Sequence, residues 1–516
     1  MIKKIKNLVT NKNVLCIFAF LSAFAGVVHY ALRTSYVFVD TAVFNGFSLT
    51  FLSLIVLNSV LLMALYVIKS NSVRSNGKEL ADSKAFSVLA FIGFALTVFF
   101  VIFDTVNLAF SGIETTTPAL HLLKQSLPLV ASFFGIAFFA LVFPRIKKGA
   151  VKKIISSLTA VGIVLSGFLY IFPVCNYKIT SDPMVIDCGD SYSVVFATNA
   201  KGTGFVEYEY NGEKYLKYDE SGGRIKADSK IHTVNVPKNE LESNSYRVGS
   251  KRVIADLSYG GRSGKEIYSD YYDFSVPSGD EQSYLTVSDW HLRLDKAYEA
   301  AEYAGDYDGV ILLGDAAPGF MFEDEVKENI VEFGGRLSGG VMPVIYARGN
   351  HETRGAVAAD IPEYLGMDSF YYSTSYGDYN FIILDSGEDK DDSHPEYGGM
   401  NNYNQYRKDM IDWLDTLQRT DDKKTFAIVH SSEICIEDDL NNRAYDNLER
   451  LGVKQILSGH MHELDYFENG SIRGYIDGGI IDGGYVASKL TLKNEEYVLE
   501  AWNEKGEQLF SKSLSY

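Results

Sequence analysis

The chain has 516 residues, of which 47% are apolar, and 48 Lys and Arg face 66 Asp and Glu, for a formal net charge of −18. Residues 1–177 carry a net charge of +10 and the remaining residues −28, so an apolar, basic first third precedes an acidic, polar remainder. This division excludes a single soluble domain, a disordered chain and a collagen-like chain, and four Cys without a CxxC pair exclude a disulfide scaffold, a zinc ribbon and a thioredoxin-type redox site.

The first third contains five apolar stretches, each close to the roughly 20 residues that a helix needs to cross a bilayer. They predict a five-helix transmembrane region within residues 1–177, with helices at about 14–32, 44–68, 86–109, 127–144 and 154–174. The first stretch is too long for a cleaved signal peptide, and four more follow it. Lys and Arg are concentrated at the N-terminus and in every second loop, which predicts a cytoplasmic N-terminus. We therefore expect a multi-pass protein of the cell membrane, with the lipid bilayer as a partner and the C-terminal part outside the cytoplasm.

Residues 178–280 alternate short runs rich in Val, Tyr and Thr with clusters of Gly, Asn, Asp and Ser. This spacing predicts an antiparallel β-sandwich domain of about seven strands, of the fibronectin or immunoglobulin-like kind. The run IHTVNVPKNELESNSYRVGSKRV followed by FSVP is similar to the fibronectin-like domain that precedes the catalytic domain in purple acid phosphatase-like proteins. Nothing in this segment indicates chemistry.

From residue 281 onward, apolar strand runs alternate with helical segments, which predicts an α/β domain over residues 281–516. Ligands bind at the carboxyl ends of strands in such sheets, and five strand ends carry metal-ligand residue types. They are Asp289-Trp290-His291, Gly314-Asp315, Gly349-Asn350-His351-Glu352, His430 and Gly459-His460-Met461-His462. Five of the nine His of the chain lie in these places, so chance clustering is a poor explanation.

The ordered set D-x-H, G-D, G-N-H-E, H and G-H-x-H resembles the calcineurin-like metallophosphoesterase family over about residues 282–516. The resemblance implies a four-layer α/β/β/α fold and a dinuclear metal centre. Carried over by position, it assigns Asp315 as the ligand shared by both ions. One ion would be held by Asp289, His291, Asp315 and His462, and the other by Asp315, Asn350, His430 and His460.

These residue types suit two divalent or trivalent ions such as Mn, Fe or Zn, whose identity stays open, and the lack of thiolates disfavours a closed structural zinc site. Two ions activate a shared water and clamp the phosphoryl oxygens during in-line attack. His351 is then placed to protonate the leaving oxygen or to stabilise charge in the transition state. Arg354 is equally consistent with a fork to a phosphate oxygen and with a structural salt bridge.

Two departures from the family pattern bear on the site. The family often has Asp where this chain has Pro318, so the group that orients His351 is open. Purple acid phosphatases have Tyr at that point and D-x-G at the first motif, whereas this chain has Pro318 and His291. We therefore expect no tyrosinate–iron(III) ligation and a site closer to the general metallophosphoesterase pattern.

The sequence as a whole predicts a membrane-anchored dinuclear-metal phosphoesterase that hydrolyses phosphate esters outside the cytoplasm by attack of a metal-bound hydroxide. The expected substrate is a phosphorylated small molecule or lipid. Two alternatives stay open: a hydrolase of lipid-linked or cell-envelope pyrophosphates, and a membrane sensor or binding protein with a degenerate phosphoesterase fold. No basic, aromatic-interleaved groove is present, so we expect no nucleic-acid binding. The sequence leaves the oligomeric state unknown.

Overall fold

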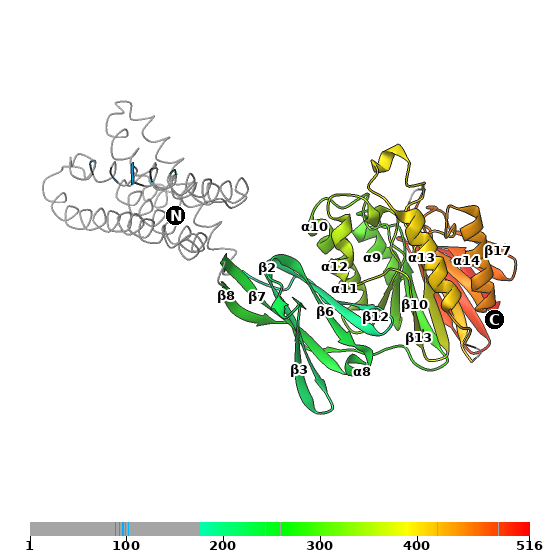
Figure 1. The fold of residues 1–516 in the computed structure, drawn as a ribbon. Helices are drawn as coiled ribbons and strands as arrows, with labels where there is room; N and C mark the ends of the chain where they lie inside the picture. The colour runs from blue at the N-terminus through cyan, green and yellow to red at the C-terminus, as the bar shows by residue number, and fades with distance from the viewer. Residues whose placement is uncertain are drawn as a thin grey trace, which may run out of the picture. The chain divides into compact units, whose positions relative to one another are not determined.

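The structure is a computed structural model of the chain. It describes residues 176–516, with gaps at 243, 258–259, 421 and 483, and six isolated positions between 88 and 102. Figure 1 shows the described strands and helices from residue 176 onward.

The expected five-helix transmembrane region, and with it the multi-pass cell-membrane localisation, needs correction. Among the described residues, no helix combines the length and the apolar character needed to cross a bilayer. From residue 176 onward the longest helix is α13 (Tyr403–Thr416), with 14 residues. At 1.5 Å per residue it reaches about 21 Å, against a hydrocarbon core of about 30 Å. Apolar composition alone does not establish a continuous spanning helix. Apart from six positions in 86–109, the five predicted ranges lie outside the described residues.

A 14-stranded mixed sheet runs through the described part of the chain. Its central strands are parallel neighbours that alternate with helices in the sequence: β10 (Gln282–Val287), β11 (Gly309–Leu312) and β12 (Pro343–Tyr346). An antiparallel meander extends the sheet from β10 and ends the chain: β20 (Gly484–Leu492), β21 (Glu496–Asn503) and β22 (Gln508–Ser515), with the short β19 (Gly479–Ile481) beside β20. β11 and β12 are buried over their whole length, as their continuous apolar runs require.

A second sheet of six strands faces the first through a shared apolar core. Its strands, in spatial order, are β13 (Tyr372–Tyr376), β14 (Tyr379–Ile383), β15 (Lys424–Ile428), β16 (Val453–Ser458), β18 (Ile472–Ile476) and β17 (Asp465–Asn469). Tyr284 of the first sheet and Phe381 of the second meet edge to face, with ring centroids 5.2 Å apart. β14, β15, β16 and β18 are parallel, so their carboxyl ends lie at one edge.

Helices cover the outer faces of both sheets (Figure 1). On the first sheet these are α9 (Leu294–Glu302), α10 (Glu323–Val326), the π-helical turn Lys327–Val331 and α11 (Glu332–Ser338). On the second they are α13 and α14 (Asp438–Arg450), which form a core of their own with the sheet. α14 turns Ala444 and Leu448 inward, and burying a side chain of the size of Leu contributes about 1.5–3 kcal/mol. The resulting order of layers agrees with the α/β/β/α arrangement that the resemblance implied.

The β-rich segment before residue 280 continues the first sheet. Its strands are β1 (Met184–Asp187), β2 (Ser191–Tyr210), β3 (Glu213–Tyr218), the short β4 (Glu220–Ser221) and β5 (Arg224–Ile225), β6 (Ser229–Pro237), β7 (Ser245–Leu257), β8 (Gly260–Tyr268) and β9 (Tyr272–Asp273). β1 pairs in parallel with β12, and Val185 faces the core of the β-rich segment while Met184 and Ile186 face the core of the α/β part. The boundary expected near residue 280 stays a prediction, and strands on both sides of it share one sheet.

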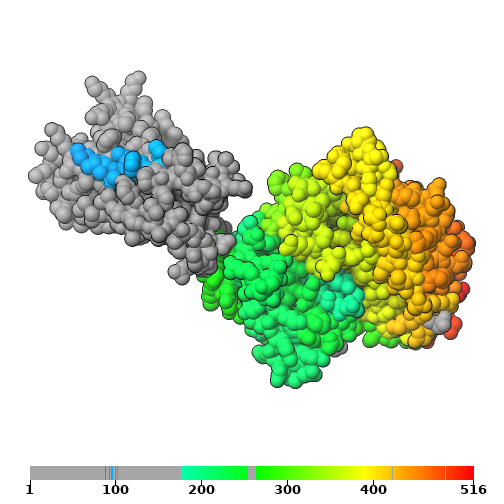
Figure 2. All heavy atoms as spheres, in the orientation of Figure 1, coloured from blue at the N-terminus to red at the C-terminus, as the bar shows by residue number. Residues whose placement is uncertain are grey.

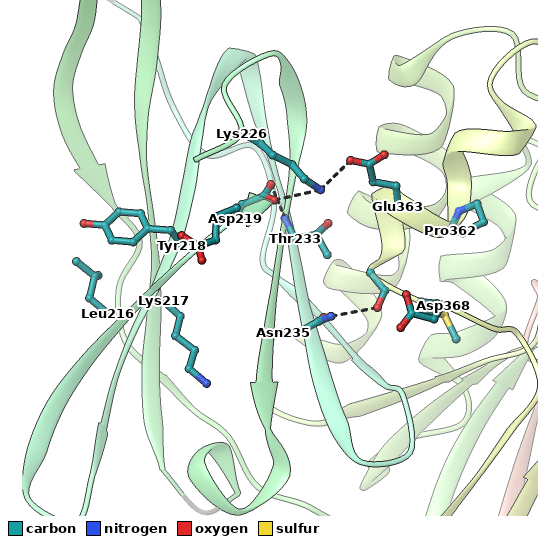
Figure 3. A pocket seen from close by; sticks show the side chains of 13 residues that line it. Leu216, Lys217, Tyr218, Asp219, Lys226, Thr233, Asn235, Pro362, Glu363 and Asp368 are labelled. Atoms are coloured by element: carbon teal, nitrogen blue, oxygen red, sulfur yellow. Dashed lines mark hydrogen bonds and ion pairs between the residues drawn. The ribbon is translucent and has the colours of Figure 1, made fainter. Parts of the chain in front are cut away.

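Besides the shared sheet, an ion pair connects the β-rich segment to α12 (Ile361–Leu365) of the α/β part. Lys226 forms ion pairs with Asp219 at 3.5 Å and with Glu363 at 2.8 Å (Figure 3). These residues line a cavity of about 750 Å³ between the β-rich segment and the turn after α12. The space-filling view shows the β-rich segment, in cyan to green, packed against the later residues of the chain, in yellow-green to orange (Figure 2).

Candidate metal centre

The seven candidate ligands all follow strand ends, and the two sheets bring them together. Asp289 and His291 follow β10, Asp315 follows β11, Asn350 follows β12, His430 follows β15, and His460 and His462 follow β16. Six of them, all but Asn350, form three overlapping groups with His351, and within each group all ligand atoms lie within 4.8 Å of one another: Asp289, His291 and His462; His291, Asp315 and His351; and Asp315, His430 and His460. The expected clustering is therefore present in the geometry.

The first group is built around Asp289, which is fully buried. Its Oδ1 lies 3.3 Å from His462 Nε2 and 4.0 Å from His291 Nε2. Its Oδ2 accepts hydrogen bonds from the Ser288 hydroxyl and from the His460 amide, which hold the carboxylate in place. One carboxylate oxygen thus remains directed at two imidazoles.

Asp315 belongs to both of the other groups, which we treat together as the second group, and it also borders the first. Its Oδ2 lies 3.2 Å from His430 Nε2 and 3.6 Å from His291 Nε2. Its Oδ1 accepts a hydrogen bond of 2.9 Å from the His351 amide. A carboxylate between the two groups can bind an ion on each side, which is the geometry that a shared ligand needs.

Asn350 points its side-chain oxygen at other acceptors. The Asn350 side-chain oxygen lies 3.2 Å from His430 Nε2 and from His460 Nδ1, and 3.3 Å from Asp315 Oδ2. Without a cation at this place, the side-chain amide of Asn350 would adopt the flipped orientation and donate its N–H groups to these atoms. With a cation among them, the oxygen is the atom that belongs there, so the donor set fits a metal ion.

Two buried atoms give an independent test of that fit. Asp289 Oδ1 and His291 Nε2 are buried and have no hydrogen-bond partner. A buried carboxylate oxygen without a partner carries a substantial desolvation cost, so such atoms are rare unless a ligand satisfies them. Both atoms belong to the first group, and a cation there would satisfy both.

The backbone at the centre is strained. Seven described residues other than Gly have a positive φ, and five of them are candidate ligands: Asp289, His291, Asp315, His460 and His462, with φ between 35° and 72°. The left-handed region costs most residues other than Gly roughly 1–2 kcal/mol. Such strain persists where the surrounding structure enforces it, and it is typical of functional sites.

Burial favours the neutral form of two histidines. It lowers the pKa of His291 and of His460 below the ordinary value of His. Neutral imidazole is the form that binds a metal ion. For Asp315, burial opposes ionisation, but the charge and hydrogen bond of His430 outweigh it and hold the pKa of that carboxyl below its usual value.

The structure also shows what orients His351. Its ring Nδ1 lies 3.0 Å from the carbonyl oxygen of Pro318. Its Nε2 lies 3.8 Å from Asp315 Oδ2, so the ring borders the metal centre. The main chain at Pro318 thus supplies the partner whose identity the sequence left open.

Arg354 lies beside His351, and two of the three guanidinium nitrogens of Arg354 donate to a carboxylate. Its Nε and Nη2 donate to the two oxygens of Glu388 at 2.9 and 2.7 Å, and Nη2 lies 3.3 Å from Asp389. Its Nη1 lies 3.3 Å from His351 Nε2. The ion pair is therefore present, and a contact of Arg354 with phosphate stays a prediction.

Sequence reasoning assigned no role to Glu352 or Glu388, although both support the centre. Glu352 is fully buried and accepts the amides of Asp315 and Ala316 at 3.0 and 2.8 Å, which fixes the turn after β11. Burial and the charge of Asp315 raise the pKa of Glu352 to about 7. Glu352 could have been recognised as part of the GNHE motif, whereas Glu388 lies in an acidic loop, where nothing distinguishes it from its neighbours.

A comparison with protein-family models adds evidence from the sequence. Residues 283–464 match the family model described as calcineurin-like phosphoesterase. No curated protein matches the chain.

Similar solved structures include GAP50, described as the anchor in the inner membrane complex of Plasmodium (15% identity, 46% of this chain and 89% of that chain, TM-score 0.34). Others are a predicted phosphoesterase from Streptococcus pneumoniae TIGR4 (14%, 46% and 100%, 0.25) and the phosphopantetheinyl hydrolase of Mycobacterium tuberculosis (14%, 39% and 91%, 0.27). These likenesses are too distant to indicate a substrate.

Proposed function

We propose that the segment that matches the calcineurin-like phosphoesterase model, residues 283–464, holds two divalent ions on the seven candidate ligands and hydrolyses phosphoric esters with them. The observation that carries the proposal is the set of strained ligand positions: five candidate ligands have left-handed backbone, and two of them present buried atoms without a hydrogen-bond partner. Decay to a binding protein would remove the reason to keep this strain. All seven positions also carry ligand residue types, which favours the enzyme over a degenerate sensor.

The proposed ligand sets follow the geometry of the two groups. Asp289, His291, Asp315 and His462 would hold one ion, and Asp315, Asn350, His430 and His460 the other. The sets contain oxygen and imidazole nitrogen and no thiolate, which suits Mn, Fe or Zn. When bound, the ions supply a water-derived nucleophile at neutral pH and stabilise charge on the phosphoryl group.

The side chains around the centre would then position the ester. With Nδ1–H donating to the Pro318 carbonyl, His351 would transfer a proton to the leaving oxygen from Nε2, which requires the doubly protonated imidazolium. Arg354 has only Nη1 free of carboxylate contacts, so its proposed share in stabilising transition-state charge falls to this nitrogen.

The test uses the full-length protein after reconstitution with Mn, Fe or Zn. We expect about two ions per chain by elemental analysis, and hydrolysis of p-nitrophenyl phosphate or of its bis ester. Asp315→Asn should lose both bound metal and turnover, because it removes the carboxylate between the two groups. The matched control is Asp306→Asn, an exposed carboxylate nearby in the sequence, which should keep both. Less than one ion per chain with no hydrolysis, or a fully active Asp315→Asn, would refute the proposal.

A further inference from the structure

Large apolar side chains are exposed on loops that follow strands of the two sheets. Among the described residues of 282–516, the exposed ones are Leu292, Tyr303, Met321, Phe322, Met400, Met461 and Leu509. All but Tyr303 and Leu509 lie on loops that follow parallel strands of the two sheets, namely β10, β11, β14 and β16. We call these five residues the apolar rim: Leu292, Met321, Phe322, Met400 and Met461. Since strands β10, β11 and β16 also deliver metal ligands, the rim and the centre occupy the same edge of the fold.

Leu292 is the most unusual member of the rim. It follows His291 directly, its side chain is 55% exposed, and its φ is +67°. A bulky residue in the left-handed region is strained, and exposing its side chain gives no packing energy in return. Its amide donates to the carbonyl of Ala316 at 3.0 Å, so the backbone holds this side chain beside the loop after Asp315. Strain that folding does not explain points to a role in binding.

Three other members, Met321, Phe322 and Met461, are also held close to site residues. Met461 is 53% exposed and lies between His460 and His462. The amides of Met321 and Phe322 both donate to Glu325, which fixes their loop. The preceding amide, of Phe320, donates to the carbonyl of Arg354 at 2.8 Å and ties this loop to the segment that carries His351.

We propose that the apolar rim binds the alkyl or acyl chain of an amphiphilic phosphoric ester whose phosphate lies at the metal centre. The inference rests on the proposed hydrolysis of phosphoric esters and names the substrate class of that site. Contact with a hydrocarbon chain removes apolar surface from water on both sides, which is favourable and needs no directional partner. Three of the five rim residues are Met, whose flexible side chain adapts to a flexible ligand. A sugar phosphate or another wholly polar ester would leave the rim exposed to water.

The test measures kcat/KM of the metal-loaded, full-length protein for methyl, butyl and octyl phosphate, and for the p-nitrophenyl diesters of the same three alkyl phosphates. We expect kcat/KM to rise at least about tenfold from methyl to octyl in the series that the enzyme accepts. Binding of methyl- and octylphosphonate, followed by calorimetry, gives a readout besides turnover. The octyl compound should bind more tightly, with a more negative heat-capacity change.

The variant for this test is the triple substitution Leu292→Asn, Phe322→Ser and Met461→Gln. Asn tolerates a positive φ, so the backbone at residue 292 should persist. The variant should keep its bound metal and its kcat/KM for the methyl ester and lose the gain with chain length. The double variant Tyr303→Ser and Leu509→Gln, exposed apolar residues outside the rim, should retain that gain.

Two results would overturn the inference: equal kcat/KM for methyl and octyl esters in the wild type, or a gain with chain length that survives in the triple variant. Either leaves the proposed function standing, because esters are still hydrolysed. The proposed function itself fails on other results: no hydrolysis of any of these esters by the metal-loaded protein, or a fully active Asp315→Asn.

Discussion

The ring Nδ1 of His351 lies 3.0 Å from the backbone carbonyl oxygen of Pro318. A carbonyl oxygen only accepts hydrogen bonds, so this contact places a proton on Nδ1 and leaves Nε2 facing the metal centre. In the pattern that the sequence resembles, an Asp side chain often stands at this position. Here the main chain takes over that role, through an atom that every residue has.

The first prediction follows from the fact that Pro318 acts through its backbone. Pro318→Ala keeps the carbonyl oxygen, so we expect kcat to stay close to that of the wild type. His351→Gln removes the proposed proton donor and should lower kcat by roughly 10²–10⁴-fold with bound metal unchanged. The loss should be larger for phenyl phosphate than for p-nitrophenyl phosphate, because phenolate is the poorer leaving group. Similar damage from both substitutions would contradict this assignment.

The second prediction concerns metal and stability. Asp289 and Asp315 bring two buried carboxylates into one centre, and a bound cation offsets the cost of their charge. Removing metal with a chelator should lower the melting temperature, and adding Mn or Zn should restore it. An ion present at 1,000 times its dissociation constant stabilises the folded state by about 4 kcal/mol. Differential scanning calorimetry measures the shift, and a shift of the same size in Asp315→Asn would show that the ion binds elsewhere.

The third prediction concerns the carboxylate that holds Arg354. Glu388 is 1% exposed and also accepts hydrogen bonds from Thr353 at 2.7 Å and Tyr397 at 3.1 Å. Glu388→Gln removes the charge from this buried position and should lower the free energy of unfolding by about 1–3 kcal/mol. The matched control is Asp389→Asn, since Asp389 is 33% exposed and contacts Arg354 at 3.3 Å. It should cost less than about 1 kcal/mol.

Urea denaturation of Glu388→Gln and Asp389→Asn measures how much each carboxylate contributes to the free energy of unfolding. Equal losses would mean that the loop after β14, rather than the buried ion pair, determines the stability of this region. The activity of Glu388→Gln adds a second readout, because a freed Arg354 has more donors available for a phosphate oxygen. We expect the KM for p-nitrophenyl phosphate to fall in this variant if Arg354 contacts phosphate.

The sequence could predict that the candidate ligands lie close together, because each of them sits where an apolar strand run ends. Strand ends are visible locally, and parallel strands bring their ends to one edge without further information. The backbone strain could not be predicted, because Asp and His rarely adopt positive φ and nothing in their neighbours at Asp289 or His460 demands it. Glu388 was missed for a related reason, since its burial depends on Arg354, which lies 34 residues away.

The larger arrangement was harder to predict. The sequence indicates strands before residue 280, but the parallel pairing of Val185 with Pro343 joins segments that lie far apart in the chain. No periodicity encodes such a partner, so the sequence could not predict that strands on both sides of residue 280 share one sheet. The prediction of transmembrane helices failed differently. It rested on the length and composition of apolar runs, and among the described residues no helix meets that requirement.

The last prediction concerns acid stability away from the metal centre. His232 on β6 is buried, and its Nε2 lies 2.9 Å from Thr198 Oγ1. Burial lowers the pKa of His232 to about 3, against an ordinary value of 6.5. Between these pH values His232 binds a proton in the unfolded chain but stays neutral in the folded chain. The contribution of His232 to the free energy of unfolding is therefore constant above about pH 6.5 and falls by about 1.4 kcal/mol per pH unit as the pH drops toward 3.

His232→Gln removes this titration and keeps a hydrogen-bonding side chain beside Thr198. The variant should therefore lose less stability than the wild type when the pH falls from 7 to 5, even if it is less stable at pH 7. Urea denaturation at both pH values measures the difference. His394→Gln is the control, because His394 is exposed and should keep the dependence of the wild type. Parallel losses in His232→Gln and the wild type would show that His232 takes up its proton in the folded protein as readily as in the unfolded chain.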